Sequence, residues 1–522
     1  MKQTILQFFE WYLPEDQKHW NRLKSQAKLL SDLGFDALWL PPAYKGNGGR
    51  SDVGYAVYDM YDLGEFDQKN TTATKYGTSV EYLEAIRTAQ KSGLKVYADI
   101  VFNHRIGADR TESFKAWPVN TQNRNELMGG LEPIEAWTQF SFDGRNKKYS
   151  DFTWNWECFK GTDYNALTKS NGLWLFEGKK WDANVSQELG NYDYVMGDDV
   201  DFNNEKVRDE LIRWGKWYQG LTGIDGYRID CVKSIDADYF GGWLDEMDEV
   251  RGSSAFAVGE YWSGDVNEVL NYLKQSRDCM HLFDVPLHFR MQQASFADGN
   301  YDLRTLFDGT ISQIRPDKSV PFVDNHDTQP HQALESWIPA WFKPIAYASI
   351  LLRNFDSPCV FYGDVYGIPQ DQIEPVGSLL EMVWIRNNFL ELPLTDFIDE
   401  DPQKVCWITS GKHPIAVIMS IGDHKEKEIV SKALAGKTMV SLDGSHSVKF
   451  NDQGQGTLLA DPGSVCIYLS QEDRDQMKDE SRKLREQKSE DPLLDEGLNQ
   501  IFSNDSFTET EEQKTADHPA AG

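Results

Sequence analysis

Carboxylate side chains follow three short apolar segments that lie far apart along the chain. Asp230 closes the segment GYRID at 226–230, Glu260 follows the apolar run at 255–258, and Asp327 closes the segment FVDNHD at 322–327. One acidic residue after a strand commonly does no more than turn the chain, but three in such places indicate a catalytic site. Two carboxyl groups in different environments can cleave a glycosidic bond, because one stays ionised as a nucleophile while the other keeps a proton to donate.

Neighbouring residues suggest how these two roles divide. Asp230 lies two residues after Arg228, so in a strand both side chains point to one face, where the guanidinium would lower the pKa of the carboxyl group. We therefore expect Asp230 to be the ionised nucleophile. Glu260 follows an apolar run, which would raise its pKa and suits an acid and base. His104 and His326 end similar segments, although either one alone is more commonly an ordinary hydrogen-bonded histidine.

These groups would meet if their segments were strands of one parallel barrel. Strand-like runs alternate with helical periodicity, and Thr78 and Glu81 form a capping box that would start one helix. Eight parallel strands separated by helices most simply close into a (β/α)8 TIM barrel of the α/β class, with its catalytic groups at the C-terminal ends of the strands. The expected strands are 5–11, 35–40, 94–102, 226–229, 255–258, 282–285, 320–323 and 359–362.

The alternation is interrupted once and later replaced, which predicts the domain organisation. Residues 1–103 would form the first part of the barrel, and residues 104–206, rich in Trp, Asn, Asp and Gly, an inserted irregular β-rich domain after strand 3. Residues 207–394 would complete the barrel, and short runs between Gly and Asp turns predict a C-terminal antiparallel β domain at 395–470. Residues 471–522 read as an acidic tail with a short charged helix near 473–490 and disorder beyond it.

Composition excludes several classes of function. The 522 residues carry 53 Lys and Arg against 83 Asp and Glu, a net charge of −30, which argues against a nucleic-acid partner and against docking on anionic membranes. No run reaches the roughly 18 apolar residues of a membrane span. The six cysteines are scattered without a CxxC pair, which predicts reduced thiols and, with no signal peptide evident, a cytoplasmic protein that we expect to be monomeric. Aromatic residues make up 13% of the chain, and some are expected to line a groove for a sugar.

Four segments together resemble a known family. The segments DIVFNH at 99–104, GYRID at 226–230, VGE at 258–260 and FVDNHD at 322–327 are similar, in the same order, to the four signature regions of the α-amylase family, glycoside hydrolase family 13. The segments FFEWY at 8–12, DVGY at 52–55 and NHDTQP at 325–330 bring the chain closest to bacterial liquefying-type enzymes and their intracellular fungal relatives. The resemblance extends over residues 1–470.

The resemblance implies an endo-acting, retaining α-amylase that cleaves internal α-1,4 bonds of starch, glycogen or maltooligosaccharides. Asp230 would attack the anomeric carbon, Glu260 would act as acid and base, and Asp327 would stabilise the oxocarbenium-like transition state. Tyr55 would stack on a sugar ring. The full set of expected substrate contacts is Tyr55, His104, Arg228, Lys233, Trp262 and His326.

Other activities would use the same residues differently. A 4-α-glucanotransferase has the same carboxylates but passes the glycosyl group to a sugar hydroxyl instead of water, and acceptor choice depends on the shape of the groove. A catalytically inactive glucan-binding protein would be expected to have lost one of the three carboxylates, and this chain keeps all three.

The resemblance also implies a structural calcium ion. Its ligands would be Asn103, Asp193, Asp199 and the carbonyl of Ser234, which stands where the family often has a histidine. Oxygen ligands of this kind suit calcium. Bacterial relatives place an aspartate at the position of Lys160, where it helps to hold further metal ions. We therefore predict a single calcium ion, with the Lys160 ammonium group near Asp182 or Asp193 in place of the others.

Overall fold

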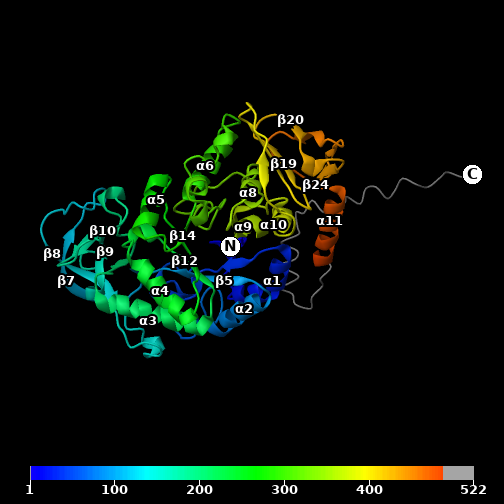
Figure 1. Ribbon diagram of the computed structural model, residues 1–522. Coiled ribbons are helices and arrows are strands. Elements are labelled where there is room, and N and C mark those ends of the chain that lie inside the picture. The colour runs from blue at the N-terminus through cyan, green and yellow to red at the C-terminus, as the bar shows by residue number, and fades with distance from the viewer. Residues whose placement is uncertain (1, 486–522) are drawn as a thin grey trace, which may run out of the picture.

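The computed structural model describes residues 2–485, and in this range eight parallel strands form one sheet that closes on itself (Figure 1). Phe322 pairs with Cys359 in parallel, which joins the two ends of the sheet into a ring. The predicted TIM barrel is confirmed. In sheet order the strands are β15 (Ser319–Val320), β14 (His281–Phe283), β13 (Phe256–Gly259), β12 (Gly226–Ile229), β5 (Lys95–Ile100), β2 (Ala37–Trp39), β1 (Ile5–Gln7) and β16 (Cys359–Phe361).

The helices of the barrel begin and end where local sequence signals place them. Thr78 and Glu81 form both hydrogen bonds of the capping box at the start of α2, and Gly34 ends α1 with φ at 105°, a value that glycine adopts without strain. The helices are α1 (His19–Leu33), α2 (Ser79–Lys91), α3 (Glu205–Thr222), α4 (Tyr239–Arg251), α5 (Val266–Gln275), α6 (Val285–Ser295), α7 (Ile311–Ile314), α8 (Lys343–Leu351), α9 (Tyr362–Tyr366), α10 (Leu379–Asn388) and α11 (Gln471–Arg485).

Several strands are shorter than their apolar runs. The run 5–11 continues beyond β1, and the run 320–323 continues beyond β15 as an isolated bridge. In each case the extra residues leave the ladder at the C-terminal end of the strand. Trp11, at the end of the first of these runs, contributes to the site described below.

The excursion after β5 folds into an antiparallel sheet, which lies at the left end of the molecule in Figure 1. The sequence predicts β structure here without its individual strands, because no clean alternation holds. β11 pairs with both β6 and β9, so the sheet returns to the barrel at the end of β5. The sheet order is β6 (His104–Arg105), β11 (Asp198–Val200), β9 (Phe159–Asn165), β10 (Ser170–Phe176), β7 (Arg110–Pro118) and β8 (Glu132–Gln139).

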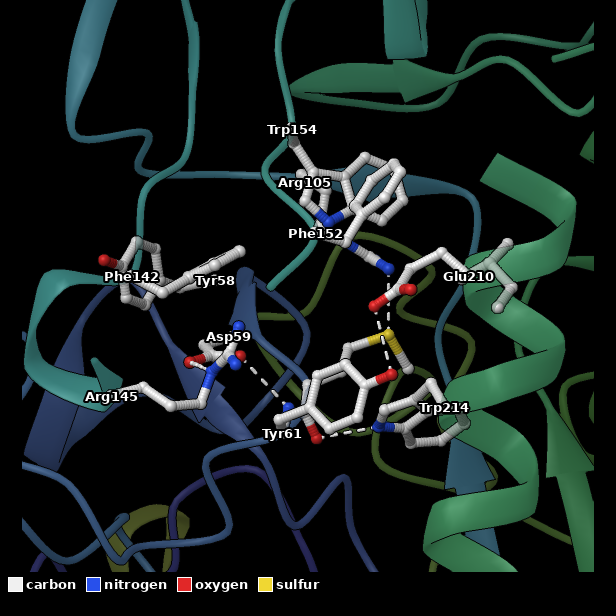
Figure 2. A pocket seen from close by; sticks show the side chains of 12 residues that line it. Tyr58, Asp59, Tyr61, Arg105, Phe142, Arg145, Phe152, Trp154, Glu210 and Trp214 are labelled. Carbon is white, nitrogen blue, oxygen red and sulfur yellow. Dashed lines mark hydrogen bonds and ion pairs between the residues drawn. The ribbon is translucent and has the colours of Figure 1, made fainter. Parts of the chain in front are cut away.

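Buried polar contacts fasten this excursion to the barrel. Arg145 of the excursion donates from Nε to Asp59 Oδ2 at 2.8 Å, as Figure 2 shows, and Ser150 of the excursion donates from its hydroxyl to Glu210 Oε1 of α3 at 2.6 Å. Asp59, Arg145 and Glu210 border a cavity of about 20 Å³, large enough for a single water molecule. The excursion is therefore held by paired charges as well as by packing, and its position relative to the barrel is fixed. A short antiparallel pair, β3 (Lys45–Gly46) with β4 (Val57–Asp59), lies beside this junction.

The C-terminal segment forms antiparallel strands at the opposite end of the molecule (Figure 1). The apolar runs at 405–409, 415–420, 438–441 and 464–469 all correspond to strands, whereas the other strands of this segment have too few apolar residues to stand out in the sequence. One sheet has the order β17 (Leu394–Asp396), β18 (Lys404–Thr409), β19 (Ala416–Ser420), β24 (Ser464–Ser470), β21 (Thr438–Ser441) and β22 (Ser447–Lys449), and β20 (Lys425–Val430) pairs with β23 (Gln455–Ala460).

The charged helix expected near 473–490 is α11, which starts at Gln471 and whose Met477 and Leu484 are buried in the main core. The rest of the predicted acidic tail, residues 486–522, lies outside the described residues. Among the helices that the structure describes, none is long and apolar enough to cross a membrane.

Candidate active site

The barrel brings the three predicted catalytic carboxylates to one face. Asp230 follows β12 directly and Glu260 follows β13, while Asp327 lies in the loop after β15. Backbone hydrogen bonds of 2.9 Å, from Asp230 N to Ile100 O and from Glu260 N to Ile229 O, extend the barrel ladder by one residue. Because the ladder continues through these two residues, their side chains are fixed by the barrel itself and not by a loop.

Arg228 links the carboxylates at the centre of the site. Its Nη1 donates to Asp230 Oδ1 at 2.7 Å and to Asp99 Oδ1 at 2.9 Å, and its Nη2 donates to Glu260 Oε2 at 2.8 Å. The side chain is 1% exposed, and although burial lowers its pKa, the surrounding carboxylates raise it well above its ordinary value. A planar guanidinium can hold several carboxylates in fixed directions, which a lysine cannot do.

The protonation of this pair differs from the sequence prediction in one respect. Burial raises the pKa of Asp230, so the expected net lowering by Arg228 is wrong, because the loss of water outweighs the nearby guanidinium. Burial also raises the pKa of Glu260, as predicted. Within the pair, the interaction with Glu260 lowers the pKa of Asp230, whereas the interaction with Asp230 raises the pKa of Glu260. The pair therefore favours a charged Asp230 beside a protonated Glu260.

Asp327 is the most open of the three carboxylates, with 22% of its side chain exposed. Burial, followed by the charge of Glu260, raises its pKa well above the ordinary value. His326 Nε2 lies 3.3 Å from Asp327 Oδ2, and burial lowers the pKa of His326 well below its ordinary value. Gln7 Nε2 lies 3.1 Å from His326 Nδ1, and since an amide nitrogen can only donate, the histidine proton is placed on Nε2, facing Asp327.

Parallel aromatic rings form a wall beside the carboxylates. Tyr55 stacks on His326 with centroids 5.0 Å apart and on Trp11 with centroids 6.0 Å apart. The Tyr55 hydroxyl donates to Asp99 Oδ2 at 2.8 Å, which ties this wall to the Arg228 cluster. His104 Nε2 bonds the Tyr55 carbonyl at 2.8 Å, and burial lowers the pKa of His104 to about 4. A flat apolar surface next to buried carboxylates suits a sugar ring.

Lys233 and Trp262 lie on the side of the site that faces the excursion. Lys233 Nζ donates to the Trp262 carbonyl at 3.1 Å and to Glu188 Oε2 at 2.7 Å, and it lies 4.1 Å from the ring centre of Tyr192. Cys231 N donates to Glu260 Oε2 at 3.2 Å, so the turn that carries Lys233 also orients the acid. Glu188 and Tyr192 belong to the excursion, which thus contributes to this wall.

Residues that the sequence analysis did not select also belong to the site. Asp99 accepts hydrogen bonds from Arg228, Tyr55 and Trp39. Its signal in the sequence is that it is a charged residue in an otherwise buried strand. Trp11 contributes a ring to the aromatic wall. Nothing in the sequence around Glu188 distinguishes it from an exposed acidic residue, because its role depends on how the excursion folds back.

A second polar cluster lies where the excursion meets the barrel. Asn103, at the end of β5, is 1% exposed, and both polar atoms of its side chain lack a hydrogen-bond partner among residues 2–485. Both oxygens of Asp199, in β11, likewise accept no hydrogen bond from the described residues. Orphaned buried oxygens of this kind are the ligands that calcium prefers, so the donor set fits the ion. Asp193 is fully buried nearby, and Ser234, the fourth predicted ligand position, is 1% exposed.

Lys160 enters this cluster from β9. Its Nζ donates to Asp193 at 2.5 and 2.6 Å and to Asp182 at 3.0 Å, as predicted, and it lies 3.4 Å from Asp199 Oδ2. Although burial lowers the pKa of Lys160, the three carboxylates raise it well above its ordinary value. One ammonium group against three carboxylates leaves two negative charges uncompensated, which is the charge of one divalent cation.

Known proteins resemble this chain over most of its length. Residues 19–388 match the family model for the alpha amylase catalytic domain. An α-amylase of Geobacillus stearothermophilus is 45% identical over 477 residues, covering 89% of this chain and 86% of that protein. A cytoplasmic α-amylase of Escherichia coli is 37% identical over 490 residues, covering 90% of this chain and 99% of that protein. The solved structure of an α-amylase from Geobacillus thermoleovorans complexed with acarbose has a TM-score of 0.58 at 20% identity, covering 90% of this chain and 98% of that chain.

Proposed function

The chain belongs to the α-amylase family, and from this membership and the site geometry we propose that Asp230 and Glu260 carry out a retaining hydrolysis of internal α-1,4-glucosidic bonds. The protein is a glycoside hydrolase that acts on α-glucans, an endo-acting α-amylase. Starch, glycogen and maltooligosaccharides all contain the bond concerned. The proposed chemistry is the same for each of these glucans.

The proposed reaction proceeds in two displacements. The Asp230 carboxylate attacks the anomeric carbon while Glu260 gives its proton to the departing glycosidic oxygen, so a glycosyl ester on Asp230 replaces the glycosidic bond. Glu260, now a carboxylate, then takes a proton from water, whose oxygen attacks the same carbon and releases Asp230. The observation that supports this proposal most strongly is the placement of both carboxyl groups at the ends of paired strands on one buried arginine, with Arg228 Nη1 2.7 Å from Asp230 and Nη2 2.8 Å from Glu260.

The other site residues would bind and stabilise the sugar in the cleaved position. Asp327, partly open to the groove, would accept hydrogen bonds from sugar hydroxyls and offset positive charge on the oxocarbenium-like ring. His326 and His104, both neutral at ordinary pH, would donate or accept hydrogen bonds without adding charge. Tyr55 would stack on the ring, and Lys233 and Trp262 would contact the leaving-group side.

We also propose that one calcium ion binds at the junction of excursion and barrel. Asn103, Asp193, Asp199 and the Ser234 carbonyl would hold it, and bound there it would supply structural charge compensation and no chemistry. The unpartnered oxygens of Asn103 and Asp199 support this assignment. Lys160 would occupy the remaining space among the carboxylates, which leaves room for a single ion.

Two observations support a proposal about the cellular compartment of the protein. The relative from Escherichia coli is named as cytoplasmic, and the six cysteines here, all within the described residues, carry free thiols. Both support a cytoplasmic protein, and a monomer remains our expectation, to be checked by light scattering on the purified chain.

Product analysis on maltoheptaose tests the proposed reaction. Hydrolysis predicts only oligosaccharides shorter than the substrate, with the first-released anomer retaining the α configuration. Products longer than maltoheptaose as the main outcome would instead indicate a glucanotransferase, and an inverted anomer would overturn the role of Asp230 as nucleophile.

A further inference from the structure

Metal-ligating side chains converge at one end of the C-terminal β domain, far along the chain from the catalytic residues. One ligand atom each from His446, Asp461 and Cys466 lies within 4.8 Å of the other two. His446 Nε2 is 2.9 Å from Asp461 Oδ2, and His424 Nδ1 is 3.8 Å from Asp461 Oδ1. We infer that these four residues form a binding site for a zinc ion or a similar transition-metal cation.

The fold brings the four residues together from separate turns. His424 precedes β20, His446 precedes β22, and Asp461 lies in the turn between β23 and β24, while Cys466 is in β24 itself. Pairing of β21 with both β22 and β24 sets the β21–β22 turn against β24. An ion held here would join three turns that no disulfide connects, since all six cysteines carry free thiols.

The donor chemistry selects the class of metal. Two imidazole nitrogens, a thiolate sulfur and a carboxylate oxygen are the ligands of zinc, whereas calcium takes oxygen ligands alone. A tetrahedral zinc site with bonds of about 2.0–2.3 Å separates neighbouring ligand atoms by roughly 3.3–3.8 Å. The 2.9 Å between His446 and Asp461 is shorter than that range and the 3.8 Å between His424 and Asp461 is at its upper limit, so the side chains would readjust when the ion binds.

Charge and exposure also fit a bound divalent cation. Binding would displace the Cys466 proton to solvent, so that one thiolate and the Asp461 carboxylate balance the two charges of the ion. Cys466 is 7% exposed, while about half of the Asp461 and His424 side chains is open to solvent, which leaves a path for the ion to enter. His424 Nε2 lies 3.8 Å from Glu426, a carboxylate that can orient the ring.

A hydrogen-bonded pair of His446 and Asp461 is the simpler alternative, and it gives no role to Cys466. Cys406 and Cys466 both belong to the apolar cluster of this domain, but only Cys466 also has a ligand atom within 4.8 Å of ligand atoms of His446 and Asp461. Cys466 thus differs from an ordinary core cysteine in facing a histidine and a carboxylate.

Cobalt titration of the full-length protein tests the site. With calcium in excess to fill the oxygen site, one equivalent of Co²⁺ should bind and produce a near-ultraviolet sulfur-to-cobalt charge-transfer band, and Zn²⁺ should abolish it. Cys466→Ser should remove the band, and His446→Ala should weaken binding at least tenfold. Cys279→Ser, which alters a partly buried thiol at the barrel, should leave the band unchanged.

The controls keep these outcomes separate from misfolding and from the proposed function. Each variant should retain the wild-type far-ultraviolet circular dichroism and the wild-type activity on starch, because the site is remote from the catalytic carboxylates. Zn²⁺ should raise the melting temperature of the wild-type protein and not that of Cys466→Ser. A folded wild-type protein without the band, or a band that persists in Cys466→Ser, would overturn the proposal, and unchanged affinity in His424→Ala would remove the fourth ligand from it.

Discussion

Two buried clusters in the described structure have the same charge composition and different surroundings. In each, one basic side chain contacts three carboxylates that come from different segments. Arg228 contacts Asp99, Asp230 and Glu260 in the active site, and Lys160 contacts Asp182, Asp193 and Asp199 at the junction of excursion and barrel.

The difference lies in how each cluster meets its surplus negative charge. The side chains of Asp230 and Glu260 are 13% and 8% exposed at the groove, whereas those around Lys160 are at most 5% exposed. In the open cluster the surplus is met by a proton on Glu260 and, during reaction, by the positive charge that develops on the sugar. The closed cluster is too deeply buried for a proton or a sugar to arrive and leave at each turnover. Its surplus negative charge therefore requires a permanently bound cation. Exposure of the carboxylates to the groove, more than the charge composition of the cluster, therefore separates the proposed catalytic cluster from the structural one.

The largest expected effect comes from removing a charge in the open cluster. Asp230→Asn should lower kcat by several orders of magnitude, because no nucleophile remains to form the glycosyl ester. Glu260→Gln should lower kcat about 10²- to 10⁴-fold on starch and much less on a nitrophenyl maltooligoside, whose leaving group needs no proton. Steady-state kinetics on both substrates measures this, with circular dichroism to show that the fold is kept.

Glu268→Gln is a matched control, because Glu268 is an acidic residue close by in the sequence on α5 that bonds only Ser263 among the contacts described. It should keep wild-type activity. If Asp230→Asn retains more than about a tenth of wild-type kcat, the assignment of the nucleophile is wrong.

The second largest expected effect is a loss of folding stability when the closed cluster loses its lysine. Lys160→Met should lower the free energy of unfolding by about 3–5 kcal/mol in chelator, because three carboxylates then lie buried without a cation. Added calcium should restore part of this loss. Urea unfolding with EGTA and with calcium measures both values. Lys179→Met, which breaks a more exposed ion pair with Asp201, should cost no more than about 1 kcal/mol, and an equal loss in the two variants would contradict the comparison.

The number of bound metal ions provides a further test of the role of Lys160. The dialysed wild-type protein should hold one tightly bound ion at this junction, and Lys160→Asp should hold more, because the substitution adds an oxygen ligand and removes the tethered positive charge. Elemental analysis counts the ions. Two or more tightly held calcium ions in the wild-type protein would show that Lys160 does not take the place of a metal.

A smaller effect concerns the pH dependence of the open cluster. Glu260 must be protonated to donate, and since burial raises its pKa, kcat/KM should hold through pH values above the ordinary carboxyl range and fall only as pH rises through this raised pKa. Rates of the wild-type protein on starch across pH test the assignment. The alkaline fall should be much weaker on the nitrophenyl maltooligoside, whose leaving group needs no proton, and an equal fall on both substrates would assign it to another group.

The smallest effect is expected at the wall that the excursion contributes. Lys233→Met should raise KM for maltooligosaccharides several-fold with little change in kcat, because it removes a contact to the leaving-group side and leaves the carboxylates in place. Lys216→Met, which changes an exposed lysine paired with Glu246, should alter neither constant. A collapse of kcat in Lys233→Met would mean that this lysine also orients Glu260.

The sequence by itself determined the features that rest on local pattern. Alternation of apolar runs and helical periods indicates the barrel, and the capping box at Thr78 indicates the start of α2. The three candidate catalytic carboxylates could be selected because each follows such a run within a few residues. The proximity of Lys160 to Asp182 and Asp193 was predictable only from the family resemblance, because relatives have at this position an aspartate that helps to hold further metal ions.

Only the tertiary structure decided the features that depend on burial and on contacts between distant segments. The raised pKa of Asp230 follows from burial, which the nearby Arg228 in the sequence does not reveal. The aromatic wall joins Trp11 to Tyr55, and the cluster of His446 and Cys466 joins separate turns, so neither has a fixed spacing along the chain. In the excursion, the hairpins β7–β8 and β9–β10 are joined into one sheet by the longer-range pairing of β10 with β7, and such pairing leaves little trace in the pattern of any one strand.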